Sequence, residues 1–323
     1  NLSVGDSAEK GGTLTLTGEI VDVDGFSLLD AAGASGGGKI HLGGSWQNSD
    51  PSVRQAVKTN VASGAVLDAS ATQSGNGGEI VAWSDIKNPN SITDVQGSLF
   101  AKGGVHSGQG GRVETSGFGL IVDGISVDTR SFSGPAGVWL LDPWNVEITT
   151  IDSLTTNTGG VFSPNNTLAK IAASTIESQL GTTSVTVNTT GAGGEDGNIT
   201  VSTAIAEDGP NLLTLDADND IILNEAITRS GTGGLKLDAD NNVTINANIS
   251  VTGSGVLDID AGNLVTMNNG KTINASSGSS SVTLDATNGI TLAGSIARST
   301  SGSHRWARAG RLGRRFAVYA RCR

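Results

Sequence analysis

Residues 213–223 read Leu213-Thr-Leu-Asp-Ala-Asp-Asn-Asp-Ile-Ile-Leu, and this phrase returns three times before residue 297. The later copies are Leu235-Lys-Leu-Asp-Ala-Asp-Asn-Asn-Val-Thr-Ile, Leu257-Asp-Ile-Asp-Ala-Gly-Asn-Leu-Val-Thr-Met and Val282-Thr-Leu-Asp-Ala-Thr-Asn-Gly-Ile-Thr-Leu. Their central aspartates lie at positions 216, 238, 260 and 285, which is the near-constant spacing of a repeat protein. Apolar and polar residues alternate within each copy, and a polar Asp-Asn or Asn-Gly cluster divides it. Each copy therefore predicts a strand, a turn and a second strand.

The first half of the chain repeats a related, glycine-rich phrase with wider spacing. Its copies are Gly11-Gly-Thr-Leu-Thr-Leu, Gly37-Gly-Lys-Ile-His-Leu, Gly77-Gly-Glu-Ile-Val-Ala and Gly110-Gly-Arg-Val-Glu-Thr. A companion phrase accompanies each copy: Leu28-Leu-Asp-Ala, Val66-Leu-Asp-Ala, Leu99-Phe-Ala and Ile125-Ser-Val-Asp-Thr. Insertions of varying length separate the copies. A looser copy of the later phrase starts at Val185, with a glycine-rich insertion at 191–197.

A strand-containing unit of about 22 residues cannot bury its apolar face alone, but stacked units share one continuous core. The sequence therefore predicts an all-β fold, a right-handed parallel β-helix or β-solenoid. A β-sandwich or propeller also has many short strands. A propeller blade, however, needs about 40 residues with its own signature, so the short period favours the solenoid.

One segment departs from the strand pattern, at residues 163–181. It carries apolar residues at 168, 171, 172, 176 and 180, an Asn cap candidate at 165 or 166, and Gly181 as a stop. We expect one short amphipathic helix near residues 166–180. Its expected role is to cover an edge of the solenoid, because exposed strand edges invite aggregation; a partner-binding helix is the alternative.

Composition excludes several classes of protein. The 323 residues include 47 glycines and 6 prolines without a collagen period, and no apolar run long enough to span a bilayer. The one cysteine, Cys322, rules out disulfides within the chain and cysteine-based metal clusters. The formal charge is −11, and residues 1–297 carry 12 basic against 31 acidic side chains. Such an acidic body repels phosphate, so nucleic acid is not an expected partner.

Four regions are predicted: 1–148, glycine-rich repeats with insertions; 149–183, a junction with the short helix; 184–297, regular repeats of about 22 residues; and 298–323, a basic tail. The tail holds 8 of the 20 basic residues and is expected to be disordered or non-native. A membrane-surface helix with Trp306, Leu312 and Phe316 on one face is the alternative, which Gly310 and Gly313 weaken.

The chain resembles the filamentous haemagglutinin-like exoproteins of bacterial two-partner secretion. The resemblance rests on four stretches: Gly77-Gly-Glu-Ile-Val-Ala-Trp-Ser-Asp, Gly110-Gly-Arg-Val-Glu-Thr-Ser-Gly, Gly137-Val-Trp-Leu-Leu-Asp-Pro-Trp-Asn-Val-Glu-Ile, and Ala173-Ser-Thr-Ile-Glu-Ser-Gln-Leu. It covers most of residues 11–297, and the Trp-Leu-Leu-Asp-Pro stretch is its most specific part. The resemblance implies a large secreted or cell-surface adhesin that is exported unfolded through a dedicated outer-membrane transporter. A host or cell-surface receptor or glycan is the implied ligand.

No signal peptide and no recognisable secretion domain opens the chain at Asn1-Leu-Ser-Val. We therefore expect a fragment of the shaft, with the transporter contacted by an N-terminal domain outside it. Asn88-Pro-Asn resembles a motif of that secretion domain but is expected to be a loop turn.

Residues that could carry chemistry are few. Stacked aspartates at 216, 238, 260 and 285 are expected to be structural, because a catalytic pair needs two different environments and a repeated position offers the same one. Weak calcium candidates are Asp216, Asp218, Asp220, Asp238 and Asp240. Ile221 stands where an EF-hand loop needs glycine, and Ile227 where it needs glutamate. His41, His106 and His304 are expected to be isolated surface side chains, and no cofactor is expected.

The predicted function is the structural shaft of a secreted adhesin rather than an enzyme. One alternative is a carbohydrate-active β-helix enzyme, a polysaccharide lyase or hydrolase, which would need non-repeating charged residues and aromatics beyond Trp46 and Trp83. Another is a glycan- or ice-binding surface of stacked threonines. The candidates for it, Thr244, Thr266, Thr272, Thr283 and Thr291, are irregularly spaced.

Overall fold

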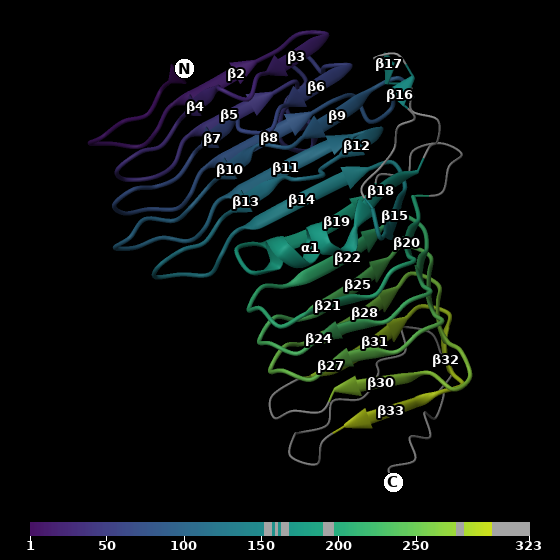
Figure 1. The fold of residues 1–323 in the computed structure, drawn as a ribbon. Helices are drawn as coiled ribbons and strands as arrows, with labels where there is room; N and C mark the ends of the chain where they lie inside the picture. The colour runs from purple at the N-terminus through teal and green to yellow at the C-terminus, as the bar shows by residue number, and fades with distance from the viewer. Residues whose placement is uncertain (152–156, 159–160, 163–167, 190–196, 276–280, 299–323) are drawn as a thin grey trace. The chain divides into compact units, whose positions relative to one another are not determined.

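The computed structural model describes residues 1–151, 157–158, 161–162, 168–189, 197–275 and 281–298 (Figure 1). Its long sheets are parallel, and it contains one α-helix among the described residues. The predicted all-β parallel β-helix is confirmed. The chain forms two compact units: Asn1–Trp144 with Ile151–Thr186, and Asn145–Thr150 with Val187–Arg323. Strand β19 (Ser184–Thr189) contains one of the divisions between them.

In the first unit, three parallel sheets run along the stack, and successive coils add one strand to each (Figure 1). The first contains β1 (Leu2–Ser3), β4 (Leu28–Asp30), β7 (Val66–Asp68), β10 (Ser98–Phe100) and β13 (Ser126–Asp128). The second contains β2 (Thr13–Leu16), β5 (Lys39–Leu42), β8 (Glu79–Trp83), β11 (Arg112–Gly117) and β14 (Val138–Pro143). The third contains β3 (Ile20–Val23), β6 (Lys58–Val61), β9 (Ile92–Val95) and β12 (Gly119–Ile121). The two repeated phrases of the first half thus form two of the three sheets.

Each glycine pair that opens a phrase of the first half lies where two backbones come close together. A Cβ atom added to Gly37 would overlap the carbonyl oxygen of Ala69, and one added to Gly110 would overlap that of Thr129. Any side chain at these corners would displace the neighbouring backbone, so glycine is required by close approach. The Gly-Gly pair therefore recurs because every coil brings two backbones close together at this corner.

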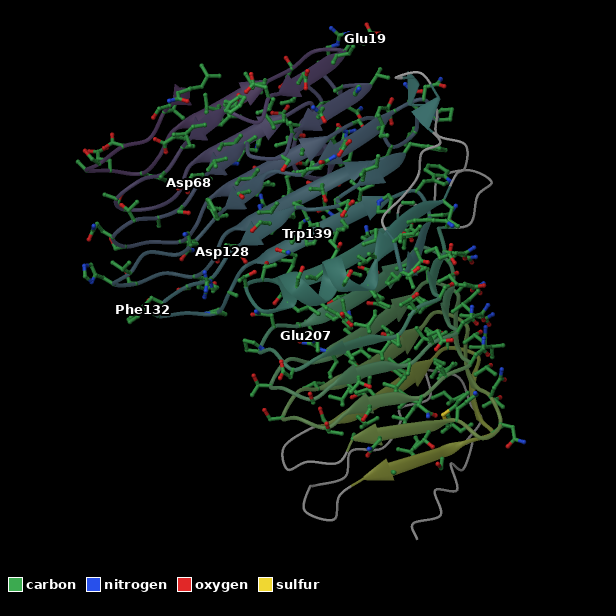
Figure 2. The ribbon with its side chains drawn as sticks, viewed as in Figure 1. Glu19, Asp68, Asp128, Phe132, Trp139 and Glu207 are labelled. Carbon is green, nitrogen blue, oxygen red and sulfur yellow. The ribbon has the colours of Figure 1, made fainter. Side chains whose placement is uncertain are left out.

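Aspartates of the companion phrase close the turns that follow their strands. The side chain of Asp30 accepts a hydrogen bond from the N–H of Ala32 at 3.0 Å, that of Asp68 from Ser70 at 2.9 Å, and that of Asp128 from Arg130 at 3.0 Å. This is the local turn bond that aspartate favours. The side chains of Asp68 and Asp128 are shown in Figure 2.

In the second unit each full coil contributes three strands. One sheet contains β22 (Leu213–Ala217), β25 (Leu235–Ala239), β28 (Leu257–Ala261) and β31 (Val282–Ala286). The next contains β15 (Val146–Thr149), β20 (Ile199–Val201), β23 (Ile221–Leu223), β26 (Asn242–Ile245), β29 (Leu264–Met267) and β32 (Gly289–Leu292). The last contains β21 (Ile205–Glu207), β24 (Ile227–Arg229), β27 (Ile249–Val251), β30 (Thr272–Ala275) and β33 (Ser295–Arg298). The repeated phrase supplies the first two strands of a coil, as predicted, and the short third strand was missed.

The core of the second unit is made by identical positions of successive coils. Leu213, Leu235 and Leu257 are register partners, and all three are fully buried. The register advances by one whole repeat from strand to strand, so each coil places its apolar side chains on those of the next. Burial of a leucine side chain is worth roughly 1.5–3 kcal/mol. Stacking therefore supplies the core that one repeat cannot form.

The helix α1 (Ala173–Leu180) is shorter than predicted. Residues 169–172 form strand β18 (Ala169–Ala172), because Ala169 and Ile171 are buried on one side while Lys170 is partly exposed. The apolar residues of this segment fit both the helix period and the strand period, and its first residues form a strand. The expected Asn cap at 165 or 166 lies outside the described residues. Gly181 ends the helix, as predicted.

Helix α1 and the residues after it cover the last strand of the first sheet. The side chain of Gln179 accepts a hydrogen bond from the N–H of Val127 at 2.7 Å, and Thr182 Oγ1 donates one to the Val127 carbonyl at 2.7 Å. These side chains take the bonds that a further strand would otherwise make with β13. The helix thus has the edge-covering role expected of it.

A small antiparallel pair also belongs to the first unit, β16 (Asn157–Thr158) with β17 (Val161–Phe162). The basic tail after Arg298 and most of the glycine-rich insertion at 191–197 lie outside the described residues. In the described part of the chain, no helix is long and apolar enough to cross a membrane.

Candidate functional site

The non-repeating side chains of the first unit gather on the outward face of β5, β8 and β11. Side chains alternate along a strand, so residues 40, 80 and 113 face the core and their neighbours face outward. Lys39, Glu79 and Arg112 are register partners in one outward row. His41, Val81 and Glu114 form the next row. We call Lys39, His41, Glu79, Arg112 and Glu114, together with Trp46, the outer cluster.

Glu79 is the ionic centre of the outer cluster. Its carboxylate lies 2.6 Å from His41 Nε2, 3.3 Å from Lys39 Nζ and 2.6 Å from Arg112 Nε. Burial acts to raise its pKa, but the hydrogen bonds with His41 and Arg112 outweigh burial and lower the pKa to about 2. Glu79 is therefore ionised at neutral pH and holds three basic side chains together.

Glu114 has the opposite character. Its side chain is fully buried; Oε1 accepts a hydrogen bond from Ser116 Oγ at 2.8 Å, and Oε2 accepts one from the N–H of Gln47 at 2.8 Å. Burial raises its pKa to about 8, and the carboxyl groups of Asp142 and Glu79 act in the same direction. Glu114 is therefore mostly protonated at neutral pH.

Aromatic side chains adjoin these carboxyl groups. The ring of Trp46 lies over the Arg112 guanidinium, 4.2 Å from the ring centroid, in a cation–π contact. Trp46 also packs on a buried apolar cluster of Val81, Trp83, Ile86, Phe118 and Trp144. In that cluster Phe118 and Trp144 stack with centroids 5.9 Å apart. Trp46 and Trp83, singled out from the sequence, thus belong to one assembly.

Two neighbouring carboxyl groups with widely separated pKa values are the combination that acid–base catalysis uses. The outer cluster supplies this pair, with Glu79 ionised and Glu114 protonated. A catalytic acid must reach its substrate, however, and Glu114 is enclosed by its strand neighbours and by Gln47. The pair of carboxyl groups is therefore closed to a substrate.

The expectation that His41 is an isolated surface side chain is wrong. His41 is 9% exposed because Glu79 lies beside it on the neighbouring strand. The two residues are 38 positions apart, so no local pattern indicates the contact. His106 is exposed, as expected, and His304 lies outside the described residues.

The calcium candidates lie in the second unit. Asp216 and Asp238 are register partners on adjacent strands, and burial together with the Asp238 carboxylate raises the pKa of Asp216. The Asp220 carboxylate accepts hydrogen bonds from the backbone N–H and the side-chain amide of Asn242. Asp218 and Asp240 lie beside the turns that follow β22 and β25. Among the described residues, no group of three or more His, Cys, Asp or Glu side chains could hold a metal ion.

Asparagine side chains form ladders along the second unit that the sequence interpretation did not include. Asn241 donates to Asn219 at 3.0 Å, Asn263 to Asn241 at 3.1 Å, and Asn288 to Asn263 at 2.8 Å. A second ladder joins Asn224, Asn246 and Asn268. The signal was present in the recurring Asn of each phrase. These ladders occupy the amide groups within the stack, and they stabilise the turns between strands.

The predicted threonine surface is incomplete. Thr244, Thr266 and Thr291 are register partners in one outward row, which Ile222 extends on the neighbouring strand. Thr283 belongs to a row with Asp258, and Thr272 pairs with Ser295. The five threonines therefore lie in three different rows.

The fold defines the class of protein: a parallel β-helix built from stacked, three-stranded coils. No protein-family model matches the chain, and no curated protein matches it at a significant level.

Proposed function

We propose that this chain is the structural shaft of a secreted or cell-surface bacterial adhesin, of the filamentous haemagglutinin-like type exported by two-partner secretion. The observation that carries the proposal is the in-register stacking of the second unit. Asp216, Asp238, Asp260 and Asp285 occupy one continuous row, and each coil bonds to the coil before and after it. Such a stack can be lengthened coil by coil, because each added coil extends the existing core. This property suits a shaft, whose role is to hold another part of the protein at a distance.

Three of the four stretches that resemble those exoproteins contribute strands to the first unit. The Trp-Leu-Leu-Asp-Pro stretch forms β14, and the two Gly-Gly phrases at 77 and 110 form β8 and β11. The proposal includes export through an outer-membrane transporter and attachment to a host or cell-surface receptor or glycan. The acidic body favours neither nucleic acid nor other polyanions as partners.

Removing one whole coil tests the shaft. We expect deletion of residues 235–256 to leave a cooperatively folded protein, because Leu257 takes the register position of Leu235 beside Leu213. Far-UV circular dichroism and thermal unfolding measure this. The matched control deletes residues 235–245, half a coil, which leaves the following strands without register partners. If the half-coil deletion folds as well as the whole-coil deletion, the modular shaft is wrong.

A second candidate function is supported by the outer cluster. The separated pKa values of Glu79 and Glu114 beside Trp46 favour a carbohydrate-active enzyme. Incubation with a panel of polysaccharides would then release new reducing ends or unsaturated products. Glu114→Gln should abolish that release, since the amide cannot donate the catalytic proton. Because Glu114 is enclosed, activity requires the residues that cover it to move aside. A wild-type protein that releases no product excludes this second candidate.

A further inference from the structure

A loop of the first unit covers the outer cluster and is closed on itself. Residues 43–57, which we call the strap, leave the sheet after β5 and return before β6. The N–H of Ala56 donates to the Gly43 carbonyl at 2.8 Å, so the two ends of the strap meet. Gly43 has a φ of 71°, a conformation that glycine adopts without strain. The strap can therefore lift from its base without breaking the pairing of β5 with β8 or of β6 with β9.

At its base the strap accepts a hydrogen bond from the N–H of Asp85 through the Ala56 carbonyl, and Trp46 packs on the apolar cluster. Three further contacts join the strap to β8 and β11. The Trp46 ring lies on Arg112, the Gln47 N–H donates to Glu114, and Gln55 Oε1 accepts a hydrogen bond from Trp83 Nε1 at 3.0 Å. The first two contacts are to β11 and the third is to β8. The contact between the Gln47 N–H and Glu114 is made at a strained turn.

Gln47 and Asn48 have φ values of 46° and 49°, and they are the two non-glycine positions with positive φ in the described residues. Backbones in this region cost energy for residues with a side chain. The strain places the Gln47 N–H against the Glu114 carboxyl group. Lifting the strap would release the strain and uncover Glu114.

The charged and titratable groups around Glu114 are of two kinds. The acidic groups disfavour ionisation of Glu114, and the basic groups are already paired with Glu79. Glu79 on β8 and Asp142 on β14 are acidic. The guanidinium of Arg112 on the same strand is bound to Glu79 and stacked on Trp46, and His41 and Lys39 on β5 are paired with Glu79. The strap contributes the Gln47 N–H, which by itself favours the ionised form, and Asp50, which interacts with His41. An ionised Glu114 therefore needs water, which it can reach by displacing the strap.

We infer that the strap is a proton-coupled cover, closed while Glu114 is protonated and released when Glu114 ionises. Closing the strap binds one proton at neutral pH, since Glu114 is protonated when covered and ionised when exposed to water. The open fraction then rises with pH from the ordinary pKa of a glutamate to the pKa of about 8 of the covered residue, and becomes constant above it. Release removes Trp46 from the buried apolar cluster that contains Trp83, Phe118 and Trp144. The outer cluster thus presents an aromatic surface at alkaline pH and a closed one in acid.

Hydrogen exchange of the whole chain, read by mass spectrometry on peptides from the strap, tests the inference. After correction for the intrinsic exchange rate, protection of the strap should fall about a thousandfold between pH 5 and pH 9. Peptides from the core of β8 and β11 should stay protected throughout. Equal corrected protection of the strap at the two pH values would overturn the inference.

Glu114→Gln is the decisive variant, because the amide oxygen can accept from the Gln47 N–H and the amide nitrogen can donate to Ser116 Oγ, while the side chain carries no charge at any pH. Its strap should show the same corrected protection at pH 5 and pH 9. Asp94→Asn is the matched control: Asp94 is a partly buried acid on β9 whose pKa burial raises, and its replacement should leave the wild-type change of the strap intact. A thousandfold change that persists in Glu114→Gln contradicts the assignment to Glu114.

Two further variants keep the inference testable if Glu114→Gln fails to fold. Gln47→Pro removes the donated N–H and cannot adopt a φ of 46°, so its strap should exchange as the released form even at pH 5. His41→Gln removes the histidine that is bound to Glu79 and should leave the pH dependence of the strap in place. Loss of that dependence in His41→Gln would assign the effect to the histidine and overturn the inference.

Discussion

Replacing Arg229 by alanine is expected to lower the free energy of unfolding by about 3–5 kcal/mol. Arg229 lies on β24 and is fully buried inside the second unit. Its register partners on the neighbouring coils are Glu207 and Val251. Its guanidinium pairs with the Glu207 carboxylate and donates to the Asn211 carbonyl. Without Arg229, the largely buried Glu207 carboxylate keeps the N–H of Gly209 but loses its counter-ion, and the Asn211 carbonyl loses the guanidinium donor. Figure 2 shows the position of Glu207.

The matched control replaces both members of the pair. Arg229→Met combined with Glu207→Leu removes both charges and fills similar volume, so it should be near neutral or stabilising. Urea unfolding followed by far-UV circular dichroism measures the three proteins. If Arg229→Ala is as stable as the double variant, the ion pair does not carry the stability that its burial implies.

Trp139→Ala should destabilise the first unit by about 3–5 kcal/mol. Trp139 on β14 is fully buried in the core row that continues Ile40, Ile80 and Val113. Its Nε1 donates to Thr115 Oγ1 at 3.1 Å. Removing the indole leaves a cavity that the surrounding strands cannot fill, because their backbones are bonded on both sides.

Two comparisons separate the causes of that loss. Trp139→Phe keeps most of the volume and removes the donor, so it should cost about 1–3 kcal/mol. Phe132→Ala, on the loop before β14, should change stability by less than about 0.5 kcal/mol, because this ring is 88% exposed (Figure 2). Thermal and urea unfolding of the three variants give the order. If Phe132→Ala were as unstable as Trp139→Ala, the loss of stability would follow from removing any aromatic ring and not from the burial of Trp139.

The sequence predicted the coil well because its signal is periodic. Leu213, Leu235 and Leu257 recur at the same place in each repeat, and the structure stacks them in register. Prediction was weaker where the signal was short. The three-residue strand β24 was missed, and the start of α1 was placed too early because residues 168–172 fit both periods.

The outer cluster could not be predicted in the same way. Glu79 and Glu114 belong to different copies of the Gly-Gly phrase, in which the corresponding residues are not repeated. Lys39, Glu79 and Arg112 do occupy the same place in three successive phrases, after Gly37-Gly, Gly77-Gly and Gly110-Gly. Alignment of the phrases would have indicated this charged row. Nothing in the phrases indicates that the strap covers it.

The sequence by itself determined the repeat, and with it the parallel stacking, since identical apolar positions can be buried only against one another. The tertiary structure decided which polar side chains became buried. Glu114 is enclosed because the strap folds back over its strand, and Arg229 lies inside because Glu207 on the preceding coil faces it. Burial and charge pairing depend on neighbours that are distant in the sequence, and the coil is what brings those neighbours together.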